Sequence, residues 1–234
     1  MINILYEDSH LLVCVKPLGV LSQPDLGDGE DMLTLLKTYL ENKNKNKNET
    51  AYIGLVHRLD RNVGGIMVFS KKVAVTSKLS QAIQARNFTK EYYAVVHNCP
   101  QEKTGTYTDF LYKDASKSKS FVVDRLRKGV KEASLEYEVI GTKDTDEGEV
   151  ALVRIHLLTG RTHQIRVQFS SRKMPLVGDG KYGSKDNGCE IALWSYRLAF
   201  KHPIKKGDID ITQAPPDCYP WNLFARNYSN GDTT

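Results

Sequence analysis

The sequence predicts an α+β protein built around a mixed, largely antiparallel sheet. β-prone apolar segments dominate the middle of the chain, and a few other stretches have the spacing of amphipathic helices. The 234 residues show neither an internal repeat nor a strong linker, and with 40% apolar residues they can bury a substantial core. We therefore expect a single domain over residues 1–226, followed by a disordered tail over residues 227–234.

The first predicted elements are two strands and a helix. Residues 2–6 and 11–16 are apolar and flank a turn-forming segment, so they are expected to pair as antiparallel strands. Two prolines and a glycine within residues 17–24 predict a fixed loop. Apolar residues recur at helical spacing over residues 32–40, and the Asn- and Lys-rich run at 42–48 is expected to be a mobile surface loop.

Strands and two further helices fill the rest of the chain. Residues 73–86 have the pattern of an amphipathic helix, and residues 162–172 are expected to form another. Leu135, Tyr137 and Val139 alternate with glutamates, which is the period of a half-buried strand. The remaining strands are expected at residues 66–70, 88–96, 106–112, 121–125, 150–158, 191–200 and 209–213, with a glycine-rich loop at 175–183 and a proline-broken segment at 215–226.

Composition restricts the class of protein. No run approaches the roughly 18 apolar residues of a membrane helix, and the N-terminus lacks the basic start of a signal peptide, so we expect a cytoplasmic protein. The four cysteines are far apart and form no Cys-x-x-Cys pair, which predicts reduced, structural thiols. The net charge of +5 suits a polyanionic partner without requiring one.

A charged cluster lies between two apolar segments. His57, Arg58, Asp60 and Arg61 are followed by the pair Gly64-Gly65. Because a carboxylate between two arginines is favoured in its ionised form, Asp60 is suited to act as a nucleophile or base. A structural ion pair beside a Gly-Gly turn explains the same residues equally well.

A second cluster begins the helix expected at residues 162–172. Arg161, Thr162 and His163 lie near its N-terminus, where backbone N–H groups attract anions. Arg166 shares a helix face with Thr162 and His163, which makes it the natural partner for Asp60. Solvated arginines are nevertheless the commoner outcome in such a position.

A third feature lies on the strand expected at residues 88–96. Lys90 and Tyr92 face one side of this strand and Tyr93 faces the other. One tyrosine can therefore line a cleft, where aromatic faces stack on nucleobases, although packing is the commoner role.

These clusters occur in one order along the chain, together with Lys16-Pro17-x-Gly19, Pro24, Gly178-Asp179 and Tyr182-Gly183. In this order and spacing, over residues 5–200, they strongly resemble the RluA-like family of RNA pseudouridine synthases. The resemblance implies the pseudouridine synthase fold, with a central, mainly antiparallel mixed sheet, flanking helices and a catalytic cleft. It also implies isomerisation of uridine to pseudouridine in structured ribosomal or transfer RNA, without cofactor or metal.

The resemblance assigns roles to individual residues. Asp60 matches the catalytic aspartate, Tyr92 the tyrosine that stacks on the target base, and Arg166 the arginine that pairs with the aspartate. Arg58 matches the residue expected to enter the RNA stack that the uridine leaves. The substrate-binding set is expected to comprise Arg58 with His57, Leu59, Arg161, His163 and Ile165, of which Leu59 and Ile165 form apolar walls.

Two departures from the family pattern matter. Most relatives have Thr-Ser-Gly or similar after the aspartate, whereas this chain has Val63-Gly64-Gly65 and so loses both hydroxyls. Many relatives also carry an N-terminal S4-type RNA-binding domain, whereas few residues precede the first motif here, so we expect the catalytic domain alone. RNA affinity is then expected to come from basic residues such as Arg86, Lys90, Arg161, Arg172 and Lys173.

Two other classes of function deserve comparison. The altered Val63-Gly64 pair suggests a noncatalytic RNA-binding or RNA-folding protein on the same scaffold, but the intact Asp60, Tyr92 and Arg166 argue against it. A hydrolase is disfavoured because the sequence has no His-Glu-x-x-His, no Gly-x-Ser-x-Gly and no ligand-spaced His/Cys group. We expect a monomer; the sequence leaves open the target uridine, and whether Asp60 attacks the base or acts at the sugar.

Overall fold

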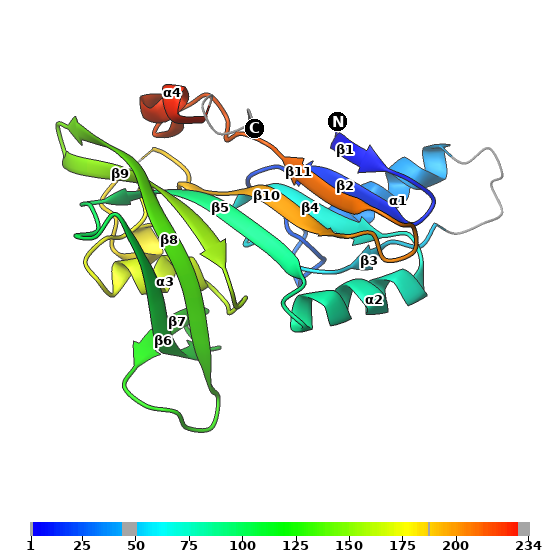
Figure 1. Ribbon diagram of the computed structural model, residues 1–234, viewed down its shortest axis with the longest axis horizontal. Helices are drawn as coiled ribbons and strands as arrows, with labels where there is room; N and C mark the ends of the chain where they lie inside the picture. The colour runs from blue at the N-terminus through cyan, green and yellow to red at the C-terminus, as the bar shows by residue number, and fades with distance from the viewer. Residues whose placement is uncertain (1, 44–50, 187, 229–234) are drawn as a thin grey trace. The chain divides into compact units, whose positions relative to one another are not determined.

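The computed structural model describes residues 2–43, 51–186 and 188–228. Most of the Asn- and Lys-rich segment that was expected to be a mobile loop lies outside these residues. The chain divides into two units, and Figure 1 shows their elements. Unit 1 comprises Met1–Thr89 with Ser195–Gln213, and unit 2 comprises Lys90–Trp194 with Ala214–Thr234.

Unit 1 is built on antiparallel strands. Strand β1 (Asn3–Glu7) pairs with β2 (Leu11–Lys16), as predicted, and β2 pairs with β4 (Gly64–Ser70). The two-residue β3 (Gly54–Leu55) pairs with β4, and β11 (Asp208–Thr212) pairs with β10 (Leu193–Lys201). The strand order β1-β2-β4-β10 places β4 in the interior of the sheet.

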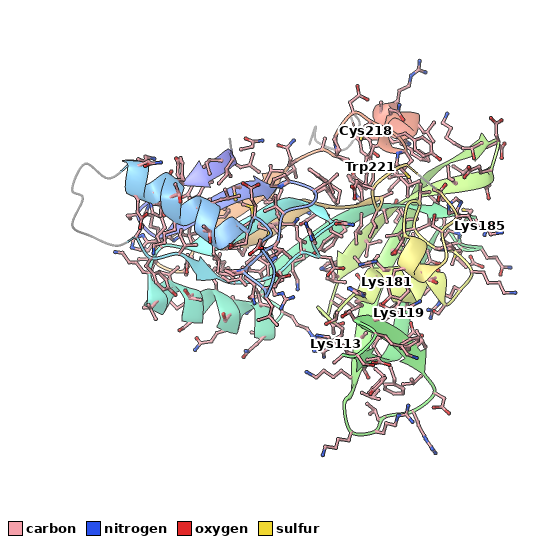
Figure 2. All side chains as sticks on the ribbon, turned by 180° about the vertical axis from the view of Figure 1, so that it is seen from behind. Lys113, Lys119, Lys181, Lys185, Cys218 and Trp221 are labelled. Atoms are coloured by element: carbon pink, nitrogen blue, oxygen red, sulfur yellow. The ribbon has the colours of Figure 1, made fainter. Side chains whose placement is uncertain are left out.

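Strand β2 of unit 1 is buried on both faces. On one face, Leu11 and Val13 of β2 pack in a cluster with Val75 and Leu79 of helix α2 (Val73–Gln84). The alternate residues of β2 are also inaccessible to solvent, so the second face is covered too. Helix α1 (Met32–Lys43) buries its apolar stripe, and Figure 2 shows it in front of the strands of this unit.

Unit 2 is a second set of antiparallel strands in the order β5-β9-β8-β6-β7. The alternation predicted for Leu135, Tyr137 and Val139 is confirmed, since all three are buried while Glu136 is exposed. The strands are β5 (Phe88–His97), β6 (Thr104–Asp114), β7 (Lys119–Val123), β8 (Val130–Thr145) and β9 (Gly148–Leu157). The α+β class with a mainly antiparallel sheet is therefore confirmed.

Helix α3 (Gln164–Ser170) is shorter than the helix expected over residues 162–172. His163 has a φ of 53°, in the left-handed region, and Lys173 has a φ of 62°. A residue with left-handed backbone interrupts helical hydrogen bonding, so His163 precedes the helix. The expectation that Thr162 and His163 share a helix face with Arg166 is therefore wrong.

The C-terminal segment contains two short helices, η2 (Trp221–Phe224) and α4 (Ala225–Tyr228). Asn227 and Tyr228 were expected to begin a disordered tail, but both belong to α4. The Tyr228 ring packs edge-on against Tyr93, with centroids 5.2 Å apart. Among the described residues, every helix is too short or too polar to span a lipid bilayer.

Candidate active site

The loop that carries Asp60 connects β3 to β4, and a buried lysine donates hydrogen bonds to its backbone. Lys16, at the end of β2, is fully buried, and its Nζ donates to the carbonyl oxygens of Pro17 (2.8 Å), Val20 (2.6 Å) and Arg61 (3.0 Å). Burial lowers the pKa of Lys16 to about 8, and the negative charge of Asp60 acts in the opposite direction. Lys16 therefore joins the proline-containing loop to the Asp60 loop and places a cation near the carboxylate.

Two reciprocal pairs of hydrogen bonds fix the backbone on either side of Asp60. Ser22 Oγ donates to the carbonyl oxygen of Leu59 (2.7 Å) and accepts from the Leu59 N–H (3.0 Å). Arg61 Nε donates to the carbonyl oxygen of Gly19 (2.9 Å), while the Gly19 N–H donates to the Arg61 carbonyl oxygen (3.0 Å). Leu59 is buried and Asp60 is half-buried. The loop is thus held in position by contacts with a segment some forty residues earlier in the chain.

His57 anchors the start of the loop to β4. The Val68 N–H donates to His57 Nε2 at 3.1 Å, so a neutral ring carries its proton on Nδ1. The His57 ring also packs at a tilt against Phe88, with centroids 6.1 Å apart. These contacts give His57, which the sequence predicted to bind substrate, a clear structural role.

The residues after Asp60 are constrained by packing. Val63 is buried, and its N–H donates to the Asp60 carbonyl oxygen at 3.0 Å. Gly65 has a φ of +116°, and a Cβ there would lie 2.3 Å from the Ser195 carbonyl oxygen. Only glycine fits such a position. The loop therefore keeps its shape through Lys16, Ser22 and Arg61, without the hydroxyls of Thr-Ser-Gly.

In unit 2, Arg166 is held by a buried, bidentate ion pair. Its Nε donates to Asp179 Oδ2 (2.7 Å) and its Nη2 to Asp179 Oδ1 (2.8 Å), and both side chains are at most 6% exposed. The guanidinium also lies over the Tyr182 ring, 5.1 Å from the centroid. Two parallel hydrogen bonds and a ring fix the guanidinium plane.

A small polar network fixes Tyr182 and the residue before it. Its hydroxyl accepts from the Ser120 N–H (2.8 Å) and lies 2.9 Å from His163 Nδ1. Lys119 Nζ donates to the Lys181 carbonyl oxygen at 2.6 Å, and Lys181 Nζ donates to the Ser118 carbonyl oxygen at 3.2 Å. Figure 2 labels these two lysines, which join β7 to the segment that carries Tyr182.

The segment between β9 and α3 is pinned by the side chain of Gln164. Its Oε1 accepts from the Arg161 N–H (3.0 Å) and from Thr159 Oγ1 (2.8 Å). Arg161 is exposed, and its Nε donates to the Glu132 carbonyl oxygen at 2.8 Å. Ile165, at the start of α3, is buried.

Tyr92 lies in the middle of β5, opposite Ile155 of β9, and is buried. Lys90 is on the same face two residues earlier, while Tyr93 packs against Tyr228. Tyr93 thus has a packing role, which leaves Tyr92 as the tyrosine of the pair that can line a cleft.

The predicted site residues are divided between the units. His57, Arg58, Leu59 and Asp60 lie in unit 1, where Arg58 is exposed. Unit 2 contains the remaining five, which are Tyr92, Arg161, His163, Ile165 and Arg166. The sequence motifs predicted no role for Ser22, Arg61 or Asp179, although Gly178-Asp179 belongs to the family pattern.

One group of possible metal ligands lies elsewhere in unit 1. Oxygen and nitrogen atoms of Asp8, His10 and His202 lie within 4.8 Å of one another. His202 Nδ1 accepts from two backbone N–H groups, at 2.8 and 3.1 Å, so its Nε2 carries the proton and donates to Asp8 Oδ2 at 3.1 Å. This arrangement favours a hydrogen-bonded turn between β1 and β2 over a metal site.

The chain matches a known protein family. The family model described as RNA pseudouridylate synthase matches residues 10–171, a range that contains Lys16, Asp60, Tyr92 and Arg166. The chain belongs to this family. The resemblance inferred from the sequence motifs is thereby confirmed.

Several synthases of this family are similar to the chain over most of its length. It is 32% identical over 213 residues to ribosomal large subunit pseudouridine synthase D of Borreliella burgdorferi, which covers 88% of this chain and 64% of that protein. It is also 32% identical to ribosomal large subunit pseudouridine synthase C of Buchnera aphidicola, over 96% of this chain and 70% of that protein. The chain therefore spans about two thirds of the length of these relatives.

Solved structures confirm the pseudouridine synthase fold. Human RNA pseudouridylate synthase domain containing 4 superposes with a TM-score of 0.76 at 21% identity, covering 94% of this chain and 91% of that one. Human RNA pseudouridylate synthase domain containing 1 gives a TM-score of 0.72 at the same identity.

Proposed function

We propose that this protein is an RNA pseudouridine synthase that isomerises uridine in structured RNA, with Asp60 as its catalytic carboxylate. One observation carries the proposal. Hydrogen bonds from the side chains of Lys16, Ser22 and Arg61 fix the backbone on both sides of Asp60. A carboxylate that reacts at one atom of a bound nucleotide must be positioned closely, and preorganisation of this kind supplies that. The proposed reaction, isomerisation of uridine to pseudouridine, is inferred from membership of the family.

The reaction breaks the bond between uracil N1 and ribose C1′ and forms a bond between uracil C5 and C1′. C5 loses its proton to solvent and N1 takes one up, so the product is an isomer of the substrate. A carboxylate can drive it by adding to the base or by acting at the sugar. Tyr92 stacks on the uracil and holds it while it rotates. No cofactor or metal is required in this scheme.

Arg166 is the proposed partner of Asp60. A guanidinium has five N–H donors, so a guanidinium that pairs with Asp179 is chemically able to pair with a second carboxylate as well. Asp179 and Tyr182 set the plane of this guanidinium, and with it the direction of the remaining N–H groups. Leu59 and Ile165, both buried, are proposed to supply apolar contacts to the uracil.

The exposed Arg58 is proposed to enter the RNA stack that the target uridine leaves. Extruding a base costs a few kcal/mol, which a guanidinium stacked in its place offsets. Arg161 and His163 are proposed to contact the same RNA, and His57 acts through the loop that it anchors.

Large-subunit ribosomal RNA is the proposed substrate class, since that is what the names of two relatives state for those proteins. Transfer RNA is the other class to test. We expect a monomer acting in the cytoplasm. A noncatalytic RNA-binding role was motivated by the Val63-Gly64 pair, but the burial of Val63 and the contacts of Leu59 and Arg61 support a working loop.

The test is tritium release from RNA labelled at uridine C5. We expect the wild-type protein to release tritium from unmodified ribosomal RNA, and Asp60→Asn to release none while it still folds and binds RNA. Asp144→Asn, a change of an exposed aspartate on β8, is the matched control and should behave as wild type. Undiminished release by Asp60→Asn would refute the role of Asp60, and release from transfer RNA alone would correct the substrate class.

A further inference from the structure

Three lysine or arginine side chains are buried among the residues that the structure describes: Lys16, Lys90 and Arg166. Lys16 donates to three carbonyl oxygens and Arg166 pairs with Asp179, so two of these cations are compensated. For Lys90, residues 2–43, 51–186 and 188–228 supply neither a hydrogen bond nor an ion pair to its ammonium. Lys90 Nζ is not among the described polar atoms that are sealed from solvent without a partner, so its ammonium can still reach a ligand from outside the protein.

The environment of Lys90 supports this interpretation. Lys90 is 8% exposed, and burial lowers its pKa with no neighbouring carboxylate acting in the opposite direction. Within residues 2–43, 51–186 and 188–228, no carboxylate therefore compensates this ammonium.

The position of the ammonium is set by two neighbouring strands. Lys90 precedes Glu91, which pairs with His156 near the end of β9, so the Lys90 side chain reaches the segment that follows β9. A Cβ at Gly160 would lie 3.5 Å from Lys90 Nζ, and Gly160 is solvent-exposed. The missing side chain at Gly160 leaves the ammonium accessible to a ligand from the solvent side.

Lys90 and Tyr92 lie on the same face of β5, two residues apart. Two residues of a strand span roughly 6.6 Å, so the two side chains lie near one another on this face. A nucleotide whose base stacks on Tyr92 therefore places its own backbone within reach of Lys90.

We propose that Lys90 binds a phosphate oxygen of the RNA backbone at the nucleotide whose uracil stacks on Tyr92. This role rests on the proposed function and adds to it a specific cation for the target nucleotide. It also explains the glycine at position 160, because a side chain there would stand between the ammonium and the phosphate. Lys90 is thus a substrate-positioning residue that does not take part in bond making or breaking.

The test compares Lys90→Met with Lys143→Met, which removes an exposed lysine from β8 of the same unit. RNA affinity is measured by filter binding over a range of KCl concentrations, with in vitro transcribed large-subunit ribosomal RNA as the probe. We expect Lys90→Met to weaken binding about tenfold or more and to reduce the slope of log K against log salt by about 0.7 to 0.9, the loss of one phosphate contact. Lys143→Met should change neither value, and Lys90→Arg should keep most of the slope.

Kinetics separate this role from a structural one. For Lys90→Met we expect a higher KM for RNA and an unchanged rate at saturating RNA, measured by tritium release. An unchanged salt slope, or a lower saturated rate with unchanged affinity, would overturn the proposal while leaving the proposed function intact. If the wild-type protein itself releases no tritium, the proposed function fails, and the salt slope still decides whether Lys90 contacts phosphate.

Discussion

At the residue scale, Asp179 neutralises a guanidinium that is almost inaccessible to solvent. Asp179→Asn keeps the shape of the side chain but removes the buried negative charge that pairs with the Arg166 guanidinium. We expect it to lower the free energy of unfolding by about 3 to 5 kcal/mol, measured by urea denaturation. Trp194 and Trp221 lie in the same unit, so their fluorescence reports the change.

The control for Asp179 is a second arginine–carboxylate pair in unit 2. Glu138 and Arg154 form an ion pair whose side chains are 35% and 44% exposed. Because solvent screens such a pair, Glu138→Gln should cost less than about 1 kcal/mol. Equal losses for the two variants would show that burial does not govern the strength of the Arg166–Asp179 pair.

Lys16 makes the stability of unit 1 depend on pH. Its pKa is about 8 in the folded protein, against an ordinary value of 10.5, so between these values the unfolded chain binds the proton and the folded protein releases it. Stability therefore rises with pH across this interval, by about 3 kcal/mol for this group. Below pH 8 both states are protonated and the cost of burying the charge is fully present.

The measurement for Lys16 is a difference between two proteins. The free energy of unfolding of the wild type minus that of Lys16→Met, followed by circular dichroism in urea, should increase between pH 8 and pH 10. Other titrating groups cancel in the difference. Parallel pH profiles for the two proteins would mean that Lys16 is not titrating in this range.

Sequence motifs identified the residues but not the contacts that hold them. The Lys-Pro motif and the His-Arg-Leu-Asp motif were recognised as separate features, whereas Lys16 and Ser22 physically join them. Arg61 had no assigned role because its partner, the Gly19 carbonyl oxygen, is a backbone atom with no signature of its own. Hydrogen bonds between side chains and distant backbone atoms depend on the folded chain and cannot be predicted from spacing.

At the scale of elements, the start of β4 depends on Gly65. Gly65→Ala places a Cβ against the backbone of Ser195 as well as straining a φ of +116°. We expect this change to prevent folding of unit 1 or to destabilise it by more than about 3 kcal/mol, because the backbone on both sides is fixed. Circular dichroism during thermal denaturation measures it.

Gly207 separates the two effects at Gly65. It has a φ of +120° in the turn between β10 and β11, and nothing lies within 4 Å of a Cβ built there. Gly207→Ala should therefore cost only the backbone strain, about 1 to 3 kcal/mol. If both variants lose the same stability, the close approach of Ser195 contributes nothing.

Strands and long helices were predicted well, and their ends were not. The two helices α1 and α2 show a full apolar stripe over three turns, so periodicity located them. The helix expected from residue 162 begins later because His163 adopts a left-handed backbone while its ring faces the Tyr182 hydroxyl. Such a conformation is selected by a tertiary contact that helical spacing does not reveal.

At the scale of the whole molecule, the antiparallel strand pairs and the α+β class followed from composition and periodicity, because alternation within each strand is a local property. The division into two units did not follow. Unit 1 takes its last strands, β10 and β11, from residues 195–213, after more than a hundred residues of unit 2. The amino-acid composition does not change where the chain re-enters unit 1, so the sequence predicted a single domain.

This return has a consequence for biosynthesis. A ribosome releases Asp60 and Gly65 long before Ser195, and at ordinary synthesis rates the interval is on the order of ten seconds. During that time β4 lacks its neighbour β10, whose residue Ser195 packs against Gly65. The segment that carries Asp60 therefore cannot complete its native packing on the nascent chain. Maturation of this segment is therefore coupled to completion of residues 195–213, and translation itself delays the first moment at which the protein can act.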